Sequence, residues 1–126
     1  MTSAVLTAVS DGMTACGLNY ALMEWKGKPA YPYFVGEYQE TESMTEDGKQ
    51  ECTFILSGFT RRSWADLETA KEKIESYFDR ISGKKVIADN GSAVAIFYAS
   101  SLPVPTGDAE LKRIDINLTI KEWKVN

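Results

Sequence analysis

The sequence contains no histidine, and this absence limits the chemistry that the chain can perform. Histidine is the usual general base of enzymes, a frequent zinc ligand and the common partner of a nucleophilic serine or cysteine. Cysteine is scarce as well, because only Cys16 and Cys52 are present and they lack the short spacing of a metal site. We expect two reduced thiols that pack as small apolar groups, rather than a disulfide. The composition therefore argues against a hydrolase.

Long apolar runs are also missing, and none approaches the ~20 residues of a membrane helix. The opening residues carry no positive charge before Lys26, so we predict no secretory leader and expect the chain in the cytoplasm. Glycine-rich phosphate loops, paired-cysteine motifs, nucleophile elbows and calcium loops are absent from the sequence. We therefore predict no cofactor, no metal and no catalytic residue, and we do not expect an enzyme.

What the sequence does contain is an uneven distribution of charge. The net charge is -4, and residues 37–51 hold six acids against a single cation, Lys49. A segment this acidic repels phosphate, so specific nucleic-acid binding is not expected. The simplest interpretation of the run is a solvated hairpin tip around Asp47-Gly48.

The most regular pattern predicts an amphipathic helix over residues 63–83. Its apolar residues recur every three or four positions and share one helical face: Trp64, Leu67, Ala70, Ile74, Tyr77, Phe78 and Ile81. Ser63 is placed to cap the first turn, with Asp66 reaching back to it, and Gly83 is placed to end the last turn. A shorter helix is predicted over residues 2–16, where Gly12 costs about 1 kcal/mol relative to alanine.

Alternating apolar and polar residues predict strands over residues 31–42, 50–62, 93–100 and 114–121. Turns are predicted at residues 43–49 and at Asn90-Gly91, the latter preceded by a short strand at residues 86–89. Residues 19–30 are interpreted as an irregular connection with room for a short strand, and residues 102–108 as a surface loop. Trp123 falls out of step with the preceding isoleucines, which indicates a bulge or a strand end that turns this aromatic outward.

These elements predict a single α+β domain over residues 1–126. The expected order is α-β-β-α-β-β. We expect an antiparallel sheet of about four strands with two helices packed on one face, because an amphipathic helix must bury its apolar stripe against another layer.

The chain has more large apolar side chains than one sheet face and two helices require. Aromatics cluster around Tyr33, and the strand at residues 50–62 is apolar on both faces. Such a surplus is typical of contact with another chain, although the same residues also fit a role in filling the core and the sheet edge. The predicted interface residues are Tyr33, Tyr38, Ile55, Phe59, Arg61, Arg62 and Trp123.

The order of elements and the local sequence resemble the tail-terminator-like proteins of tailed bacteriophages and prophages, a family also called tail-completion, head-tail joining or minor capsid proteins. The resemblance is carried by the leading helix, the aromatic and proline-containing strand start at residues 31–35, and the second strand that runs into a capped helix. It continues through the following hairpin, the proline-containing loop and the last strand at residues 114–123, and so covers nearly the whole chain.

The resemblance implies a non-enzymatic assembly protein that closes into a ring, typically a homo-hexamer, at the head-proximal end of the tail. Its partners would be further copies of itself, tail-tube proteins and head-connector proteins. It would assemble in the cytoplasm of the bacterial host and end in the tail or neck of the virion. One ring contact is expected on the hairpin at residues 37–59 and the other on the outer helix face and near Trp123. Three acids are expected to face the lumen and repel passing DNA: Glu40, Glu42 and Glu46.

Two other functions stay open. A small α+β module could bind a ligand or a peptide, either in a groove between the long helix and the sheet or along an exposed strand edge. An enzyme using a carboxylate such as Asp66 or Asp89 with a tyrosine is the third reading, although no spacing in the sequence supports it.

Overall fold

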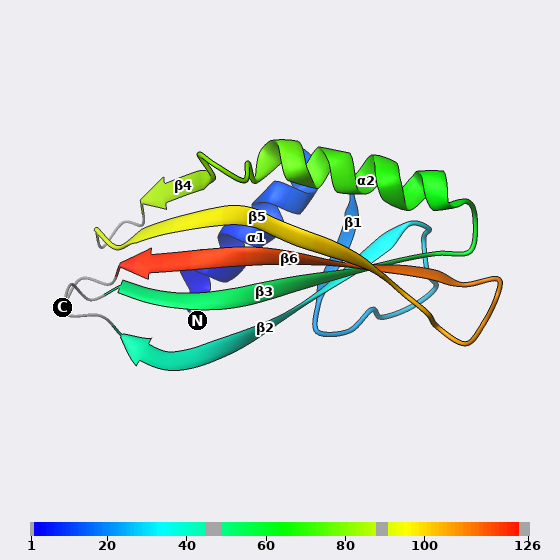
Figure 1. Cartoon of the computed structure of the whole chain (residues 1–126), viewed down its shortest axis with the longest axis horizontal. Helices are drawn as coiled ribbons and strands as arrows, with labels where there is room; N and C mark the ends of the chain where they lie inside the picture. The colour runs from blue at the N-terminus through cyan, green and yellow to red at the C-terminus, as the bar shows by residue number, and fades with distance from the viewer. Residues whose placement is uncertain (1, 45–48, 88–90, 124–126) are drawn as a thin grey trace.

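The computed structural model describes residues 2–44, 49–87 and 91–123, with the backbone alone for residues 41–44, 49 and 50. In chain order its elements are α1 (Ser3–Ala15), β1 (Asn19–Leu22), β2 (Tyr33–Met44), β3 (Lys49–Thr60), α2 (Trp64–Tyr77), β4 (Lys84–Ile87), β5 (Ala93–Val104) and β6 (Lys112–Trp123). The strands form one sheet in the order β1-β2-β3-β6-β5-β4, and Figure 1 shows the four long strands side by side. The helix predicted over residues 2–16 is confirmed as α1.

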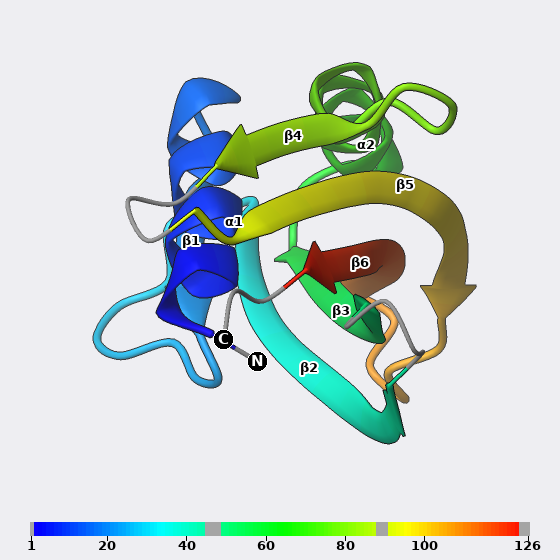
Figure 2. The ribbon, with the colours of Figure 1, turned by 90° about the vertical axis from the view of Figure 1, so that its left-hand side faces the viewer.

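The sheet corrects the predicted fold class. An antiparallel sheet of about four strands is wrong, because the described residues form six strands in one mixed, curled sheet (Figure 2). β1 runs parallel to β2, pairing Asn19 with Tyr33 and Leu22 with Gly36, whereas the other neighbours are antiparallel. The element order is α-β-β-β-α-β-β-β instead of the expected one. A strand of four residues is too short to reveal itself by alternation, which is why the sequence predicts only a connection with room for a short strand where β1 lies.

The two helices and the sheet share one hydrophobic core. Its fully buried members from α1 and α2 include Val5, Val9, Met13, Leu67 and Ile74. They meet the inward side chains of the long strands, which include Phe34, Phe54, Leu56, Ile96, Ile114, Ile116, Leu118 and Ile120. Burying a side chain of this size contributes about 1.5–3 kcal/mol, so this cluster holds the helices on the sheet.

Helix α2 is shorter than the sequence predicted. It ends at Tyr77, because the Asp79 carboxylate accepts hydrogen bonds from the backbone N–H groups of Ile81 and Ser82 and stabilises a turn there. Ile81 is consequently 89% exposed and does not extend the buried stripe. Gly83 has a positive φ of 66° but lies beyond this turn, not at the helix end.

The predicted capping box is wrong as well. The Ser63 side chain makes no capping hydrogen bond, although Ser63 occupies the N-cap position. The Asp66 carboxylate instead pairs with the Arg62 guanidinium, at 2.8 Å from Oδ2 to Nε. A charged partner within reach competes successfully for this carboxylate.

Strand β6 continues in register to its end. Its pairing with β3 is uninterrupted from Lys112 opposite Thr60 to Trp123 opposite Lys49, so no bulge lies at Trp123. The irregularity lies instead in β5, between Tyr98 and Ser100. Beyond it β5 runs on to Val104, through the start of the segment predicted as a loop.

Candidate assembly interface

The sheet has a second face, opposite the helices, which we call the outer face. Strand side chains alternate between faces, so the residues between the core positions all project there. Those with large or charged side chains are Tyr33, Val35, Glu37, Ile55, Phe59, Phe97, Arg113, Asp115, Lys121 and Trp123. Most are half-buried by one another. The surface combines aromatic, aliphatic and arginine side chains, which is the composition found at protein interfaces.

An aromatic cluster occupies one end of the outer face. Tyr33 lies directly opposite Phe59 on the neighbouring strand, and their ring centroids are 5.2 Å apart. The Trp25 ring packs on Tyr33 at 5.0 Å, since the chain folds back onto the sheet after Met23, whose φ is 70°. The guanidinium of Arg113 lies 5.5 Å from the Phe59 ring centre on the other side. Such pairs add about 0.5–1.5 kcal/mol each and keep the cluster rigid.

A hollow of about 390 Å³ lies between this fold-back segment and the sheet, with Met23 and Glu24 on one wall. Its most prominent polar group, Arg113, is already engaged by both oxygens of Asp115, at 2.9 Å and 3.2 Å. Burial raises the pKa of Tyr33, with the neighbouring Tyr31 acting in the same direction and Arg61 against it. The Arg113 guanidinium in this hollow is therefore already paired within the chain.

Four of the predicted interface residues, Tyr33, Ile55, Phe59 and Trp123, lie on the outer face. Tyr33 and Phe59 are direct neighbours at one end of it, whereas Trp123 lies at the opposite end, opposite Lys49. Tyr38 does not join them. It lies on the helix side of the sheet, 36% exposed, with its ring stacked on Phe54 at 6.4 Å between centroids.

The two predicted arginines are engaged within the chain. Arg61 Nη1 contacts Asp108 Oδ2 at 3.1 Å, and hydrogen bonds from Arg61 to Tyr31 and Asp108 raise the pKa of its guanidinium. Arg62 pairs with Asp66, as described above. Both arginines lie past the end of β3, so they flank the outer face and do not form part of it.

The predicted acids are placed only in part. Glu40 is exposed near the end of β2, opposite Cys52 of β3. The side chain of Glu42 and the whole of Glu46 lie outside the described residues, as does Asp89. Sequence reasoning missed Trp25 and Arg113; Arg113 was detectable from its place in the alternation of β6, whereas nothing local indicated the fold-back of Trp25.

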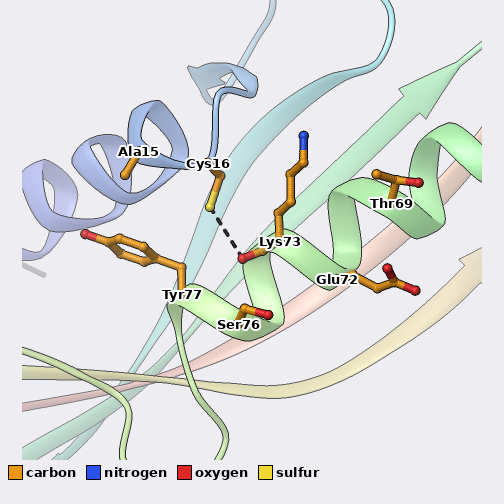
Figure 3. Close-up of a pocket in the computed structure, with 7 residues that line it drawn as sticks. All are labelled: Ala15, Cys16, Thr69, Glu72, Lys73, Ser76 and Tyr77. Atoms are coloured by element: carbon orange, nitrogen blue, oxygen red, sulfur yellow. Dashed lines mark hydrogen bonds between the residues drawn. The ribbon is translucent and has the colours of Figure 1, made fainter.

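A hollow of about 670 Å³ lies between the end of α1 and helix α2 (Figure 3). The Cys16 thiol lies there and donates a long hydrogen bond to the Lys73 carbonyl oxygen at 3.6 Å. Partial burial raises the pKa of this thiol, with Lys73 acting against it. The side chains of Lys73 and Glu72 point away from each other in Figure 3. Figure 3 thus shows no convergence of these two charged groups on a ligand, and neither cysteine forms a disulfide.

Among the described residues, no group of three or more carboxylates and thiols is arranged to hold a metal ion. None of the described helices has the length and hydropathy needed to cross a membrane.

Comparison with known proteins shows the fold. No family model and no curated protein sequence matches this chain. Among solved structures, a chain in the virion of a native gene transfer agent (GTA) particle superposes with a TM-score of 0.65. The two chains are 13% identical, and the match covers 88% of this chain and 83% of the other. The chain therefore shares its architecture, over nearly its whole length, with a component of a virion.

Proposed function

We propose that this chain is a structural protein of a bacteriophage-type virion. The observation that carries the proposal is the TM-score of 0.65 over 88% of the chain to a component of a gene transfer agent virion. The likeness in fold agrees with the resemblance of the sequence to tail-terminator-like proteins. The outer face supports it further, because a sheet face carrying Ile55, Phe59 and Trp123 offers the apolar and aromatic area that subunit contacts bury.

The more specific proposal is a tail terminator, tail-completion or head-tail joining protein. Copies of the chain would close into a ring, typically a hexamer, at the head-proximal end of the tail and contact tail-tube and head-connector proteins. Assembly in the bacterial cytoplasm and a final place in the tail or neck follow from this role. Of the three acids predicted to face the lumen, Glu42 and Glu46 are proposed to line it, where carboxylates would keep DNA from adhering, and Glu40 is assigned below to the contact between copies. No catalytic step is assigned to any residue.

The test is assembly with the proteins encoded beside it. The tagged chain is co-expressed with the product of each reading frame that flanks its own gene, and captured complexes are imaged by negative-stain electron microscopy. We expect a ring that caps a tube or a connector. A chain that stays alone with every flanking product, or that turns over a small molecule, would contradict the proposal.

A matched pair of variants ties the result to the outer face. Ile55→Asp places a charge in the middle of that face and should abolish capture. Glu110→Arg changes an exposed residue in the loop before β6 and should leave capture unchanged. Circular dichroism of both variants verifies that each is folded before capture is compared.

A further inference from the structure

Two strand edges at one end of the sheet have no strand beside them among the described residues. β1 covers β2 only from Tyr33 to Gly36, and β4 forms the opposite border of the sheet. The Gly36 carbonyl accepts the Met23 N–H at 2.7 Å, so Gly36 faces the β1 side. Because backbone groups alternate along a strand, those of Tyr38 face the same way, beyond the end of β1. Open edges of this kind are templates for pairing with another chain.

The two edges lie at the same height on the sheet. Following the register across the strands, Glu40 pairs with Cys52, Cys52 with Ile120, Ile120 with Ile96, and Ile96 with Lys84. Glu40 and Lys84 are therefore the two ends of a single row. Figure 1 shows the end of β2 and strand β4 at the same end of the sheet, on opposite sides.

The edges carry opposite charge. The β2 edge at residues 37–40 carries Glu37 and Glu40, whereas β4 carries Lys84 and Lys85 and no acid. Glu37, Glu40, Lys84 and Lys85 are all exposed. Opposite charges facing each other across paired strands are favourable by about 0.2–1 kcal/mol per pair, and like charges are unfavourable. Pairing of two β2 edges or of two β4 edges is thus disfavoured, and pairing of unlike edges is favoured.

There is also space beside β4. A hollow of about 460 Å³ lies between this strand and α1, lined by Lys84 and Val86 on the strand. Asp11 of α1 also lines it and is the one described acid there. The Lys84 ammonium lies 4.8 Å from the centre of the Tyr77 ring, which holds its charge at the border of the sheet.

We propose that the β2 edge of one copy, at residues 37–40, pairs with the β4 edge of the next copy, at residues 84–87. Four antiparallel pairings separate β2 from β4, so these two strands run in the same direction. If neighbouring copies have the same orientation, the β2 of one copy would therefore pair in parallel with the β4 of the next. Different patches meet in such a contact, and a repeated contact of this kind closes into a ring when its rotation fits. The proposal deepens the proposed function by naming its ring interface. It places Glu40 between subunits and leaves the lumen to other residues.

Reversing the charges on one edge at a time tests the proposal. The variants are Glu37→Lys/Glu40→Lys on one edge and Lys84→Glu/Lys85→Glu on the other, studied by analytical ultracentrifugation up to about 1 mM protein. We expect the unaltered chain to self-associate at low ionic strength and to dissociate near 0.5 M salt, where the screening length falls to about 4 Å. Each variant alone should associate at least about tenfold more weakly, because attractive pairs become repulsive ones. An equimolar mixture of the two should recover association, since each then offers the edge that the other lacks.

The control variant Lys26→Glu/Lys28→Glu makes the same change of charge as Lys84→Glu/Lys85→Glu, but in the exposed segment after β1. It should associate like the unaltered chain. The proposal is overturned if the unaltered chain stays monomeric throughout, or if the mixture fails to associate better than its components. If rings form with tail or connector proteins but persist in both edge variants, the edge contact is wrong while the proposed function stands. If the edges pair as described but no flanking product is bound, the proposed function fails and the contact stands.

Discussion

Replacing Ile74 with alanine tests whether α2 faces the sheet as described. Ile74 has no exposed surface and belongs to the shared core. The change removes three carbon atoms, and at about 0.8 kcal/mol each the loss of burial is roughly 2.4 kcal/mol. The cavity left behind adds to this, so the free energy of unfolding should fall by about 2–5 kcal/mol. Urea denaturation followed by circular dichroism measures it, with an unchanged slope expected because the surface exposed on unfolding hardly changes.

The same chain provides a matched control. Ile81 belongs to the same apolar repeat in the sequence, yet it is 89% exposed because α2 ends before it. Ile81→Ala should therefore change the free energy of unfolding by less than about 0.5 kcal/mol. Comparable losses in both variants would mean that the helix continues to Gly83, and a negligible loss for Ile74→Ala would mean that α2 presents a different face to the sheet.

Three further predictions follow from single contacts. Gly12→Ala should destabilise the protein by about 1–3 kcal/mol in thermal denaturation, although alanine favours helices, because the new methyl carbon would lie 2.4 Å from the Phe78 ring; a gain in stability would refute the contact. Burial raises the pKa of Tyr20 from 10.0 to about 12, so its neutral form is favoured in the folded state and the stability it lends is lost as pH rises from about 10 to about 12. Ultraviolet titration should show a phenol that titrates near pH 12 and that Tyr20→Phe removes. Thr2→Ala should cost about 1–3 kcal/mol, because the Thr2 hydroxyl donates to Glu122, a carboxylate that is 1% exposed; an unchanged midpoint in urea would show that this carboxylate has another donor.

Part of the interface was predictable from alternation alone. Tyr33, Ile55, Phe59 and Trp123 occupy positions between core residues, and a period of two assigns them to the outer face once the core residues are known. The same rule places Tyr38 on the side of the sheet that carries the buried Phe34. Predicting Tyr38 as an interface residue was therefore inconsistent with its position in the strand. The engagement of Arg61 by Asp108 was beyond prediction, because these residues are distant in the sequence and meet only when β5 and β6 fold back beside β3.

By itself, the sequence determined the features that repeat along a short stretch of chain: helix α1, the stripe around Ile74, the alternating strands and the acidic segment at residues 37–51. These are set by the geometry of a helix or a strand, in which a few neighbouring residues suffice to define a face. The tertiary structure alone decided that β1 runs parallel to β2, that Gly12 must leave room for Phe78, and that Glu40 and Lys84 end one row of the sheet. Each of these depends on which distant segments become neighbours, and that choice is made by the packing of the whole core.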